Sequence, residues 1–277
     1  MRVRATSRVL AVIGDPVGHS LSPEMHNAAI AALGLDAIYV ALRATSGTFD
    51  TVARGVLAAG GALNITVPFK RQAAELVAVA DGSVKRTGAC NTIWGDCARP
   101  EGDNTDIVGV REASRALLSG RRVERALVIG TGGSARAAAV AATDEWPGAT
   151  VTVASRDPER AREFVVWGKK AGVGCRVAGD GEFEPADLVI NATPLGLQAG
   201  DALPVERAAL GGFSAVLDLV YAKGGTALVR AARDAGVPAA DGRGVLVAQG
   251  AAAFARFFGV PAPTEIMRAA VDDALRP

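Results

Sequence analysis

A glycine-rich segment, GTGGSARAA at residues 130–138, is the clearest sign of chemistry in this sequence. It follows an apolar run at 126–129 and opens an alanine-rich stretch, the order of strand, turn and helix that a dinucleotide site requires. Gly130 would permit the tight turn, and Gly132 would let backbone approach a pyrophosphate at the helix N-terminus. Ala135 takes the third small position, where helix packs against strand. A glycine turn that binds nothing is the alternative interpretation.

The choice between nicotinamide cofactors depends on the residues after the second strand of this unit, at 150–154. An acidic residue at this strand end would bind the ribose of NAD, whereas Arg156 offers a guanidinium suited to the 2′-phosphate of NADP. Arg160, one helical turn further on, adds a second cation. Asp157 either weakens this positive field or merely caps a helix. The sequence therefore favours NADP, with NAD as the alternative.

Lys70 and Asp106 are residue types that transfer protons, and both are predicted to stand where a helix begins. Lys70 ends the segment NITVPFK at 64–70, in which Pro68 suits the first turn of a helix. Asp106 ends the segment DNTD at 103–106, next to a helical stretch. In one cleft the two would form a proton-transfer pair. A solvated lysine and a helix-capping aspartate are the simpler alternatives.

Another helix start follows the first predicted strand, in the segment GDPVGHSLSPE at 14–24. Ser22 before Pro23 is a typical N-cap pattern, which explains one hydroxyl. Ser20 is not needed for that cap, so two hydroxyls beside a helix N-terminus indicate a small carboxylate site. We interpret His19 as part of the loop structure rather than as a catalyst.

These segments are positioned by short apolar runs that alternate with helical stretches, which predicts an α/β fold with mostly parallel strands. Such sheets bind ligands where strands end and helices begin. The predicted strands are 8–14, 37–42, 62–66, 90–94, 126–129, 150–154, 188–191 and, as the last, 215–219. The predicted helices are 23–33, 47–59, a segment after Pro68, 107–118, 226–235 and, as the final one, 244–258.

The length of 277 residues fits two modest domains, with a boundary predicted in the interval 105–122. Residues 1–107 would form a substrate-binding α/β domain, and residues 108–239 a Rossmann-like domain that binds the dinucleotide. The helix at 244–258 follows the second domain and is free to pack back on the first. Residues 240–277 would then complete a discontinuous N-terminal domain.

Composition excludes several classes of function. Basic residues number 30 and acidic residues 29, a balance that argues against a nucleic-acid or anionic-membrane surface. No apolar run reaches the length of a membrane span, and the N-terminus lacks the core of a signal peptide. Three widely spaced cysteines suit a reducing cytoplasm, and two histidines argue against a His-based metal site or triad. We therefore expect a cytoplasmic protein with no metal, nucleic-acid or membrane partner.

Eight segments, in this order along the chain, resemble the shikimate dehydrogenase family, and the resemblance covers nearly the whole sequence. They are SLSP at 20–23, NITVPFK at 64–70, GACNT at 88–92, DNTD at 103–106, the fingerprint from Gly130, NATP at 191–194, DLVY at 218–221, and DG at 241–242 leading to Gln249.

The resemblance implies reversible NADP-linked reduction of 3-dehydroshikimate to shikimate, on the route to chorismate and the aromatic amino acids. It implies Lys70 and Asp106 as the catalytic pair, in which Lys70 protonates the carbonyl oxygen and Asp106 orients Lys70. The substrate contacts implied by position are Ser20, Ser22, Thr66, Asn91, Tyr221 and Gln249. The implied cofactor contacts are Gly130, Gly132, Gly133, Ser134, Ala135, Ser155, Arg156, Arg160, Thr193 and Gly242.

Two departures from the family pattern concern the cofactor. The usual Asn-Arg-Thr patch reads Ser-Arg-Asp at 155–157, and Val245 stands where a methionine beside the nicotinamide is common. The nearest alternative is a quinate/shikimate or aminoshikimate dehydrogenase that uses NAD or NADP. A non-catalytic sensor and a folate-type dehydrogenase are more distant ones, and retention of Lys70 and Asp106 argues against the sensor. The expected partner is a small molecule, and the expected assembly is a monomer or homodimer.

Overall fold

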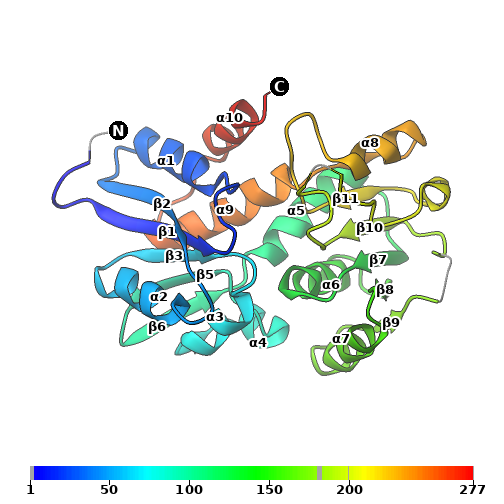
Figure 1. The fold of residues 1–277 in the computed structure, drawn as a ribbon, viewed down its shortest axis with the longest axis horizontal. Coiled ribbons are helices and arrows are strands. Elements are labelled where there is room, and N and C mark those ends of the chain that lie inside the picture. Colours follow the sequence, from blue (N-terminus) through cyan, green and yellow to red (C-terminus); the bar gives the residue numbers. More distant parts are fainter. Residues whose placement is uncertain (1–2, 180–182, 199, 277) are drawn as a thin grey trace. The chain divides into compact units, whose positions relative to one another are not determined.

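The computed structural model describes residues 3–179, 183–198 and 200–276, and it divides into two compact units, each built on a six-stranded sheet (Figure 1). Unit 1 comprises Met1–Thr105 and Leu246–Ala274, so it is discontinuous along the chain. Unit 2 comprises Asp106–Val245 and Leu275–Pro277. The predicted α/β class, with a Rossmann-like second unit, is confirmed.

The sheet of unit 1 is mixed and has the order β2-β1-β3-β5-β6-β4. β1 lies between β2 and β3 and runs parallel to both, whereas β5 is antiparallel to both β3 and β6. The strands are β1 Arg8–Gly14, β2 Ala37–Arg43, β3 Ala62–Ile65, β4 Val79–Ala80, β5 Thr92–Asp96 and β6 Arg99–Asp103.

Helices cover both faces of this sheet because β1 and β3 are apolar on both sides. One face packs on α2 and α3 through residues such as Phe49 and Phe69. The other is covered by α1 and the returning α9, where a Cβ on Gly250 would collide with Met25 of α1. The helices are α1 Ser22–Ala32, α2 Phe49–Ala58, α3 Lys70–Leu76, α4 Gly82–Thr87, α9 Arg243–Phe258, whose residues from Leu246 onward belong to unit 1, and α10 Thr264–Ala274.

The sheet of unit 2 is entirely parallel, with the order β12-β11-β10-β7-β8-β9. Parallel strands need crossover connections, and helices supply them on both faces. The strands are β7 Arg125–Ile129, β8 Thr150–Ala154, β9 Cys175–Val177, β10 Leu188–Asn191, β11 Val216–Asp218 and β12 Ala239–Ala240. The helices are α5 Asp106–Leu118, α6 Gly133–Glu145, α7 Pro158–Lys170, the 3₁₀ helix η1 Arg207–Gly212 and α8 Ala227–Asp234.

Alanine allows the helix after the glycine fingerprint to approach its neighbours closely. Residues 137–142 of α6 are all buried, five alanines and one valine, in the core shared with α5, α7 and the sheet. The opposite face of the sheet packs on α8 and η1 through residues such as Leu228 and Leu210. Small side chains at these positions explain how a chain with few aromatic residues fills its core.

Two predicted chain-order features are wrong. The segment 244–258 is not the final helix, because α10 follows it at Thr264–Ala274. The strand near 215–219 is not the last, because the two-residue β12 pairs beside it. Over the part of the chain that the structure describes, no helix combines the length and apolar character needed to cross a membrane.

Candidate active site

Segments that carry predicted substrate contacts meet at one edge of the unit 1 sheet. β1 and β3 are parallel, so both end at the same edge. Thr66, just after β3, donates its N–H to the Ile13 carbonyl of β1 at 2.9 Å. On the other side of β3, Ile65 donates its N–H to the Asn91 carbonyl at 2.8 Å. The backbone therefore holds these segments in fixed register.

The serine segment before α1 has a different capping pattern from the predicted one. α1 begins at Ser22 with Leu21 at the N-cap, so the prediction that Ser22 caps this helix is wrong. Ser20 Oγ instead accepts the N–H of Ser22 at 3.3 Å, which gives Ser20 a helix-terminal role. Ser22 is buried, and its hydroxyl hydrogen-bonds to Tyr39. Ser22 still lies in the first turn of α1 and Ser20 just before it, where the helix dipole favours a carboxylate.

Lys70 is the first residue of α3 and is half-buried. Its carbonyl accepts the N–H of Cys90 at 2.7 Å, which ties the start of α3 to the segment that carries Asn91. The end of β1 can lie close to Thr66 only because residue 14 is glycine. A Cβ on Gly14 would collide with the methyl group of Thr66. Lys70, Thr66 and Asn91 thus lie on adjoining segments of one unit.

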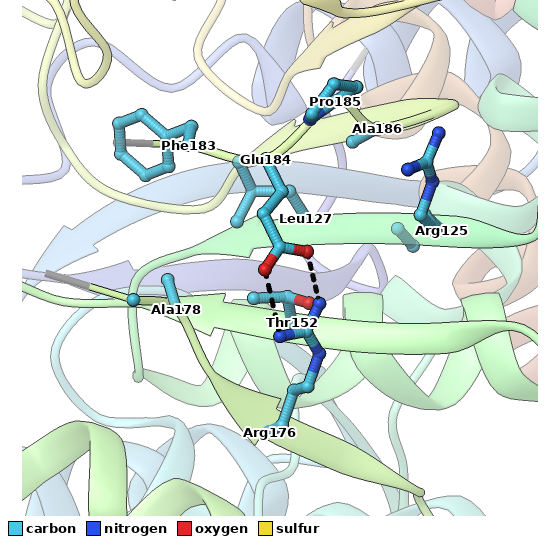
Figure 2. Close-up of a pocket in the computed structure, with 11 residues that line it drawn as sticks. Arg125, Leu127, Thr152, Arg176, Ala178, Phe183, Glu184, Pro185 and Ala186 are labelled. Carbon is cyan, nitrogen blue, oxygen red and sulfur yellow. Dashed lines mark hydrogen bonds and ion pairs between the residues drawn. The ribbon is translucent and has the colours of Figure 1, made fainter. Parts of the chain in front are cut away.

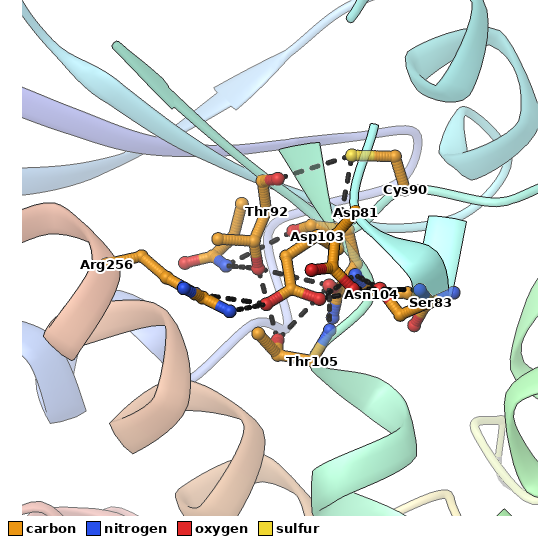
Figure 3. Close-up of polar contacts among 10 residues, drawn as sticks. Asp81, Ser83, Cys90, Thr92, Asp103, Asn104, Thr105 and Arg256 are labelled. Atoms are coloured by element: carbon orange, nitrogen blue, oxygen red, sulfur yellow. Dashed lines mark hydrogen bonds and ion pairs between the residues drawn. The ribbon is translucent and has the colours of Figure 1, made fainter. Parts of the chain in front are cut away.

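Asn91 is buried, and a polar network that includes Thr92 and Thr105, both labelled in Figure 3, fixes the orientation of its side-chain amide. Its Oδ1 accepts the N–H and the hydroxyl of Thr105 at 2.8 and 3.1 Å, and the hydroxyl of Thr92 at 3.0 Å. Its Nδ2 lies 3.5 Å from Gln249 Oε1 on α9. An amide oxygen has two lone pairs, so these donors saturate it. A ligand that contacts this amide therefore meets its nitrogen, on the side where Gln249 lies.

Two residues that the sequence left without a role, Tyr39 and Asn64, extend this network to Ser22. The Tyr39 hydroxyl donates to Asn64 Oδ1 at 2.8 Å, and Asn64 Nδ2 donates to Thr92 Oγ1 at 3.1 Å. Burial raises the pKa of Tyr39, which keeps its hydroxyl neutral and able to donate. A series of hydrogen bonds thus joins Ser22 to Asn91. Asn64 opens the 64–70 motif, whereas nothing in the sequence distinguishes Tyr39 from a core tyrosine.

Asp106 and Tyr221 belong to unit 2. Asp106 is buried, is the first residue of α5, and follows Thr105 directly along the chain. A carboxylate in the first turn of a helix is favoured by the helix dipole, so Asp106 contributes to the start of α5 whatever else it does. Tyr221 is half-buried and follows β11.

The glycine fingerprint forms the predicted strand, turn and helix and fits a pyrophosphate. Gly130 has φ +113°, a conformation that favours glycine, and a Cβ there would lie 3.1 Å from the Ala192 carbonyl oxygen. Among the described residues, no side chain caps α6 at Gly132, and nothing would lie within 4 Å of a Cβ added to this glycine. The start of α6 therefore has the space that a phosphate needs beside helix N-terminal N–H groups.

The residues after β8 combine an exposed cation with a helix cap. Asp157 Oδ1 accepts the N–H groups of Glu159 and Arg160 at 3.0 and 3.3 Å, so its interpretation as an N-cap is confirmed. Its Oδ2 lies 3.6 Å from Arg160 Nε, an exposed ion pair of small energy. Arg156 is exposed, and Ser155 Oγ accepts the Asp157 N–H at 3.2 Å. An exposed guanidinium beside a hydroxyl fits a 2′-phosphate.

Thr193 and Gly242 occupy structured loops of unit 2. Thr193 Oγ1 donates to Asn191 Oδ1 at 2.7 Å, and Asn191 Nδ2 donates to the buried Asp218 at 2.8 Å. Burial raises the pKa of Asp218, and the hydrogen bonds that its carboxylate accepts from Thr226, the Val220 N–H and Asn191 oppose that effect. Gly242 has no room for a side chain, because a Cβ would collide with the Leu219 carbonyl. The motif residues Asn191 and Asp218 thus hold the loops in place.

A small hollow beside the starts of β7 and β10 is not a candidate for the active site (Figure 2). Its volume is about 20 Å³, room for about one water molecule. Arg176 and Glu184 form an ion pair beside it. Parallel sheets bind ligands at the carboxyl ends of their strands, and this hollow lies by the amino ends.

Comparison with known proteins identifies the family. Residues 12–93 match the shikimate dehydrogenase substrate binding domain, and residues 242–271 match the shikimate 5′-dehydrogenase C-terminal domain. The chain is 42% identical over 271 residues to the NADP(+) shikimate dehydrogenase of Halobacterium salinarum. The match covers 95% of this chain and 98% of the relative. The chain belongs to the shikimate dehydrogenase family. The resemblance inferred from the eight motifs is thereby confirmed.

Solved structures similar to this shikimate dehydrogenase family member include proteins with different bound cofactors. The shikimate 5-dehydrogenase of Thermus thermophilus in complex with NADP(H) and shikimate has a TM-score of 0.85 and 33% identity, covering 96% of this chain and 99% of that one. The quinate dehydrogenase of Corynebacterium glutamicum in complex with NAD has a TM-score of 0.86 and 27% identity, with the same coverage. The family fold thus accommodates both nicotinamide cofactors.

Proposed function

We propose that this chain is an NADP-dependent shikimate dehydrogenase, which reversibly reduces 3-dehydroshikimate to shikimate. The observation that carries the proposal is the 42% identity, over nearly the full length of both chains, to an enzyme of that name. The convergence of the Ser20, Thr66, Lys70 and Asn91 segments at one sheet edge supports it. The substrate domain is then 1–107 completed by 240–277, and the NADP domain is 108–239.

The substrate carboxylate is assigned to Ser20 and Ser22, which lie at the positive end of α1. The substrate hydroxyls are assigned to Thr66, Asn91 and Gln249, with Tyr221 as a further contact. Because Asn91 Oδ1 is saturated by protein donors, Asn91 donates to a substrate oxygen rather than accepting from it. This polarity suits the oxygen-rich ring of shikimate.

The catalytic roles are assigned to Lys70 and Asp106. Bound NADPH supplies the hydride that adds to the ketone carbon of 3-dehydroshikimate. Lys70 donates a proton to the ketone oxygen as negative charge develops there, which completes the alcohol, and it accepts that proton in the reverse direction. Asp106 orients Lys70 and a neighbouring hydroxyl. Each of the two is the last residue of a motif that the family shares, at 64–70 and 103–106.

The cofactor is assigned to the open head of α6 and to the end of β8. Gly130, Gly132, Gly133, Ser134 and Ala135 form the pyrophosphate turn. Ser155, Arg156 and Arg160 would hold the 2′-phosphate, because two cations there outweigh the single charge of the capping Asp157. Thr193 and Gly242 complete the cofactor contacts. Val245 would lie beside the nicotinamide, where the family commonly has methionine.

The proposal extends to the setting in which the enzyme works. The three cysteines, all among the described residues, form no disulfide bond, and Cys90 is buried, which suits a reducing compartment, so we assign the enzyme to the cytoplasm. Its partner is the small-molecule substrate rather than a nucleic acid or membrane, and its assembly is a monomer or homodimer. Its product belongs to the route toward chorismate and aromatic amino acids.

A quinate dehydrogenase using NAD is the second candidate, because one such enzyme has the same fold with a TM-score of 0.86. The acidic Asp157 at the 2′-phosphate position favours it. The two-serine segment favours shikimate, because quinate-preferring relatives often carry threonine at the second position. Aminoshikimate is the third substrate of this class.

Initial rates of oxidation decide between these candidates. Shikimate, quinate and aminoshikimate are each assayed with NADP and with NAD, and kcat/KM is compared across the six pairs. We expect shikimate with NADP to give the highest value. A higher value for quinate with NAD would replace the proposal by the second candidate, and no turnover of any pair would overturn both.

A further inference from the structure

The Asp103 carboxylate organises the turn that carries Thr105, and it does so while largely shielded from solvent. Its side chain is 12% exposed. One oxygen accepts the Asn104 N–H at 2.7 Å and the Ser83 hydroxyl at 2.6 Å. The turn places the Thr105 N–H on Asn91 Oδ1. Asp103 thus fixes the backbone that orients the Asn91 amide (Figure 3).

Arg256 of α9 neutralises this carboxylate from the far side of the turn (Figure 3). Its Nε and Nη2 both donate to Asp103 Oδ2, at 3.1 and 3.0 Å. The same guanidinium lies over the Trp94 ring of β5, 5.4 Å from its centroid. Arg256 therefore clamps α9 to the hairpin of β5 and β6 through two contacts. The flat face of its guanidinium lies on Trp94, and two of its N–H groups bind Asp103.

Arg256 and Gln249 are seven residues apart on α9, which places them on the same face two turns apart. The contact of Arg256 with the hairpin therefore sets how that face lies against the segment of Asn91. Gln249 Oε1 is 3.5 Å from Asn91 Nδ2, the outer limit of a hydrogen bond, so a small shift of α9 would separate them. The spacing of these two amides depends on the clamp at Arg256.

We propose that Arg256 is a positioning residue of the substrate site, which acts through Asp103 to set the spacing of Gln249 and Asn91. The inference rests on the proposed function, in which Asn91 and Gln249 contact the substrate. Without Arg256, Asp103 Oδ2 loses its cation in a shielded place, and the carboxylate turns toward water. Its other oxygen then leaves the Asn104 N–H, and the turn that orients Asn91 loosens.

The test compares Arg256→Met, Arg256→Lys, Asp103→Asn and the double variant by steady-state kinetics. Arg256→Met should raise the KM for shikimate about tenfold or more and lower kcat, because displaced positioning groups cost both. The KM for NADP should stay within about twofold of the parent value. General damage to the fold would raise the KM for NADP together with that for shikimate. Arg256→Lys keeps the charge and should restore part of the loss.

The double variant measures whether the two residues act as one unit. If Arg256 acts through Asp103, the double variant is no worse than the worse single variant, because the second change removes nothing further. Arg176→Met, which breaks the exposed ion pair with Glu184 in unit 2 (Figure 2), is the matched control and should leave both KM values unchanged. A KM for shikimate within about twofold of the parent in Arg256→Met would overturn the proposal, whatever its melting temperature.

Hydrogen exchange separates failure of this inference from failure of the proposed function. Peptides that contain Asn104 and Thr105 should exchange faster in Arg256→Met than in the parent, with no substrate present, and Arg176→Met should leave them unchanged. This result supports the positioning role even if the parent does not oxidise shikimate. Unchanged exchange in those peptides would overturn it. If Arg256→Met does not fold, Arg256→Lys and Asp103→Asn carry both measurements.

Discussion

His26 of α1 stacks flat on Tyr39 of β2, with ring centroids 4.3 Å apart and ring planes 6° apart. Both residues are almost wholly buried, and Phe254 of α9 stacks near the imidazole at 6.1 Å. Neither ring nitrogen of His26 has a hydrogen-bond partner among the described residues. Burial lowers the pKa of His26 to about 3, so the ring is neutral in the folded protein near neutral pH.

This depressed pKa predicts loss of stability in mild acid. Below its ordinary pKa near 6.5, His26 binds a proton in the unfolded chain but not in the folded one, until the pH approaches 3. Acid therefore favours unfolding, by about 1.4 kcal/mol per pH unit from this group as the pH falls through that window. His26→Phe should remove this part of the slope and be no less stable at pH 7, because the unpaired nitrogens disappear.

Urea unfolding of the parent and of His26→Phe at pH 7, 6 and 5 measures the difference in slope. The exposed His19, changed to Gln, is the control and should behave like the parent. Equal slopes in the parent and His26→Phe would show that His26 does not stay neutral inside the fold.

Lys70→Ala should lower kcat by about 10²-fold or more, the scale of a lost general acid, with nearly unchanged cofactor affinity. Lys70 is half-buried at the start of α3, and its backbone carbonyl, which alanine keeps, accepts the N–H of Cys90, so the fold should survive. Steady-state kinetics with fluorescence titration of NADPH measures both effects. Turnover within a few-fold of the parent would exclude Lys70 as the proton donor.

Replacing Ser20 and Ser22 together by Ala should raise the KM for the substrate far more than the KM for NADP. Some stability should also be lost, because Ser20 satisfies one backbone N–H of α1 and the buried Ser22 hydroxyl bonds to Tyr39, each bond worth about 0.5–1.5 kcal/mol. Ser114→Ala, at a buried serine of α5, is the matched control and should not move either KM. If the double variant is less stable but its KM for the substrate is unchanged, the substrate carboxylate binds elsewhere.

Arg156→Ala should weaken NADP by about ten- to a hundredfold and leave NAD nearly untouched, since a charge-assisted hydrogen bond is worth about 1.5–3 kcal/mol. Asp157→Thr should raise NADP preference and still fold normally, because threonine also caps helices. The measured quantity is the ratio of kcat/KM for the two cofactors. If neither substitution moves that ratio, the end of β8 does not contact the 2′-phosphate.

Strand positions could be predicted closely because apolar runs in this chain are short and bounded by glycine or polar residues. β1, β8 and β10 have the predicted bounds, and most other strands differ by one or two residues. β4, β9 and β12 were missed because two or three residues are too few to show the alternation of a strand. β6 was missed because its residues Arg99–Asp103 include a proline and a glycine, which argue against a strand. α10 was missed although Met267 and Val271, four residues apart, give Thr264–Ala274 the apolar stripe of an amphipathic helix, which packs on α1.

Side-chain roles were harder to predict where partners are distant along the chain. The pair of Arg256 and Asp103 spans 153 residues, and neither residue lies in a local pattern that indicates the other. Serine before proline usually caps a helix, which predicts Ser22 as the N-cap, but α1 begins at Ser22 itself and Ser20 supplies the acceptor. Asp157 shows the opposite case, because its cap is made entirely by residues two and three positions away.

The discontinuity of unit 1 has a consequence for how the protein is made. Residues 106–245 emerge from the ribosome between the two segments of unit 1, a delay of roughly 7–28 s at about 5–20 residues per second. During that time the face of the first segment that carries Met25 and His26 lacks its cover from α9. Unit 2 can fold first, while the earlier segment waits with apolar surface open to chaperones or to other nascent chains.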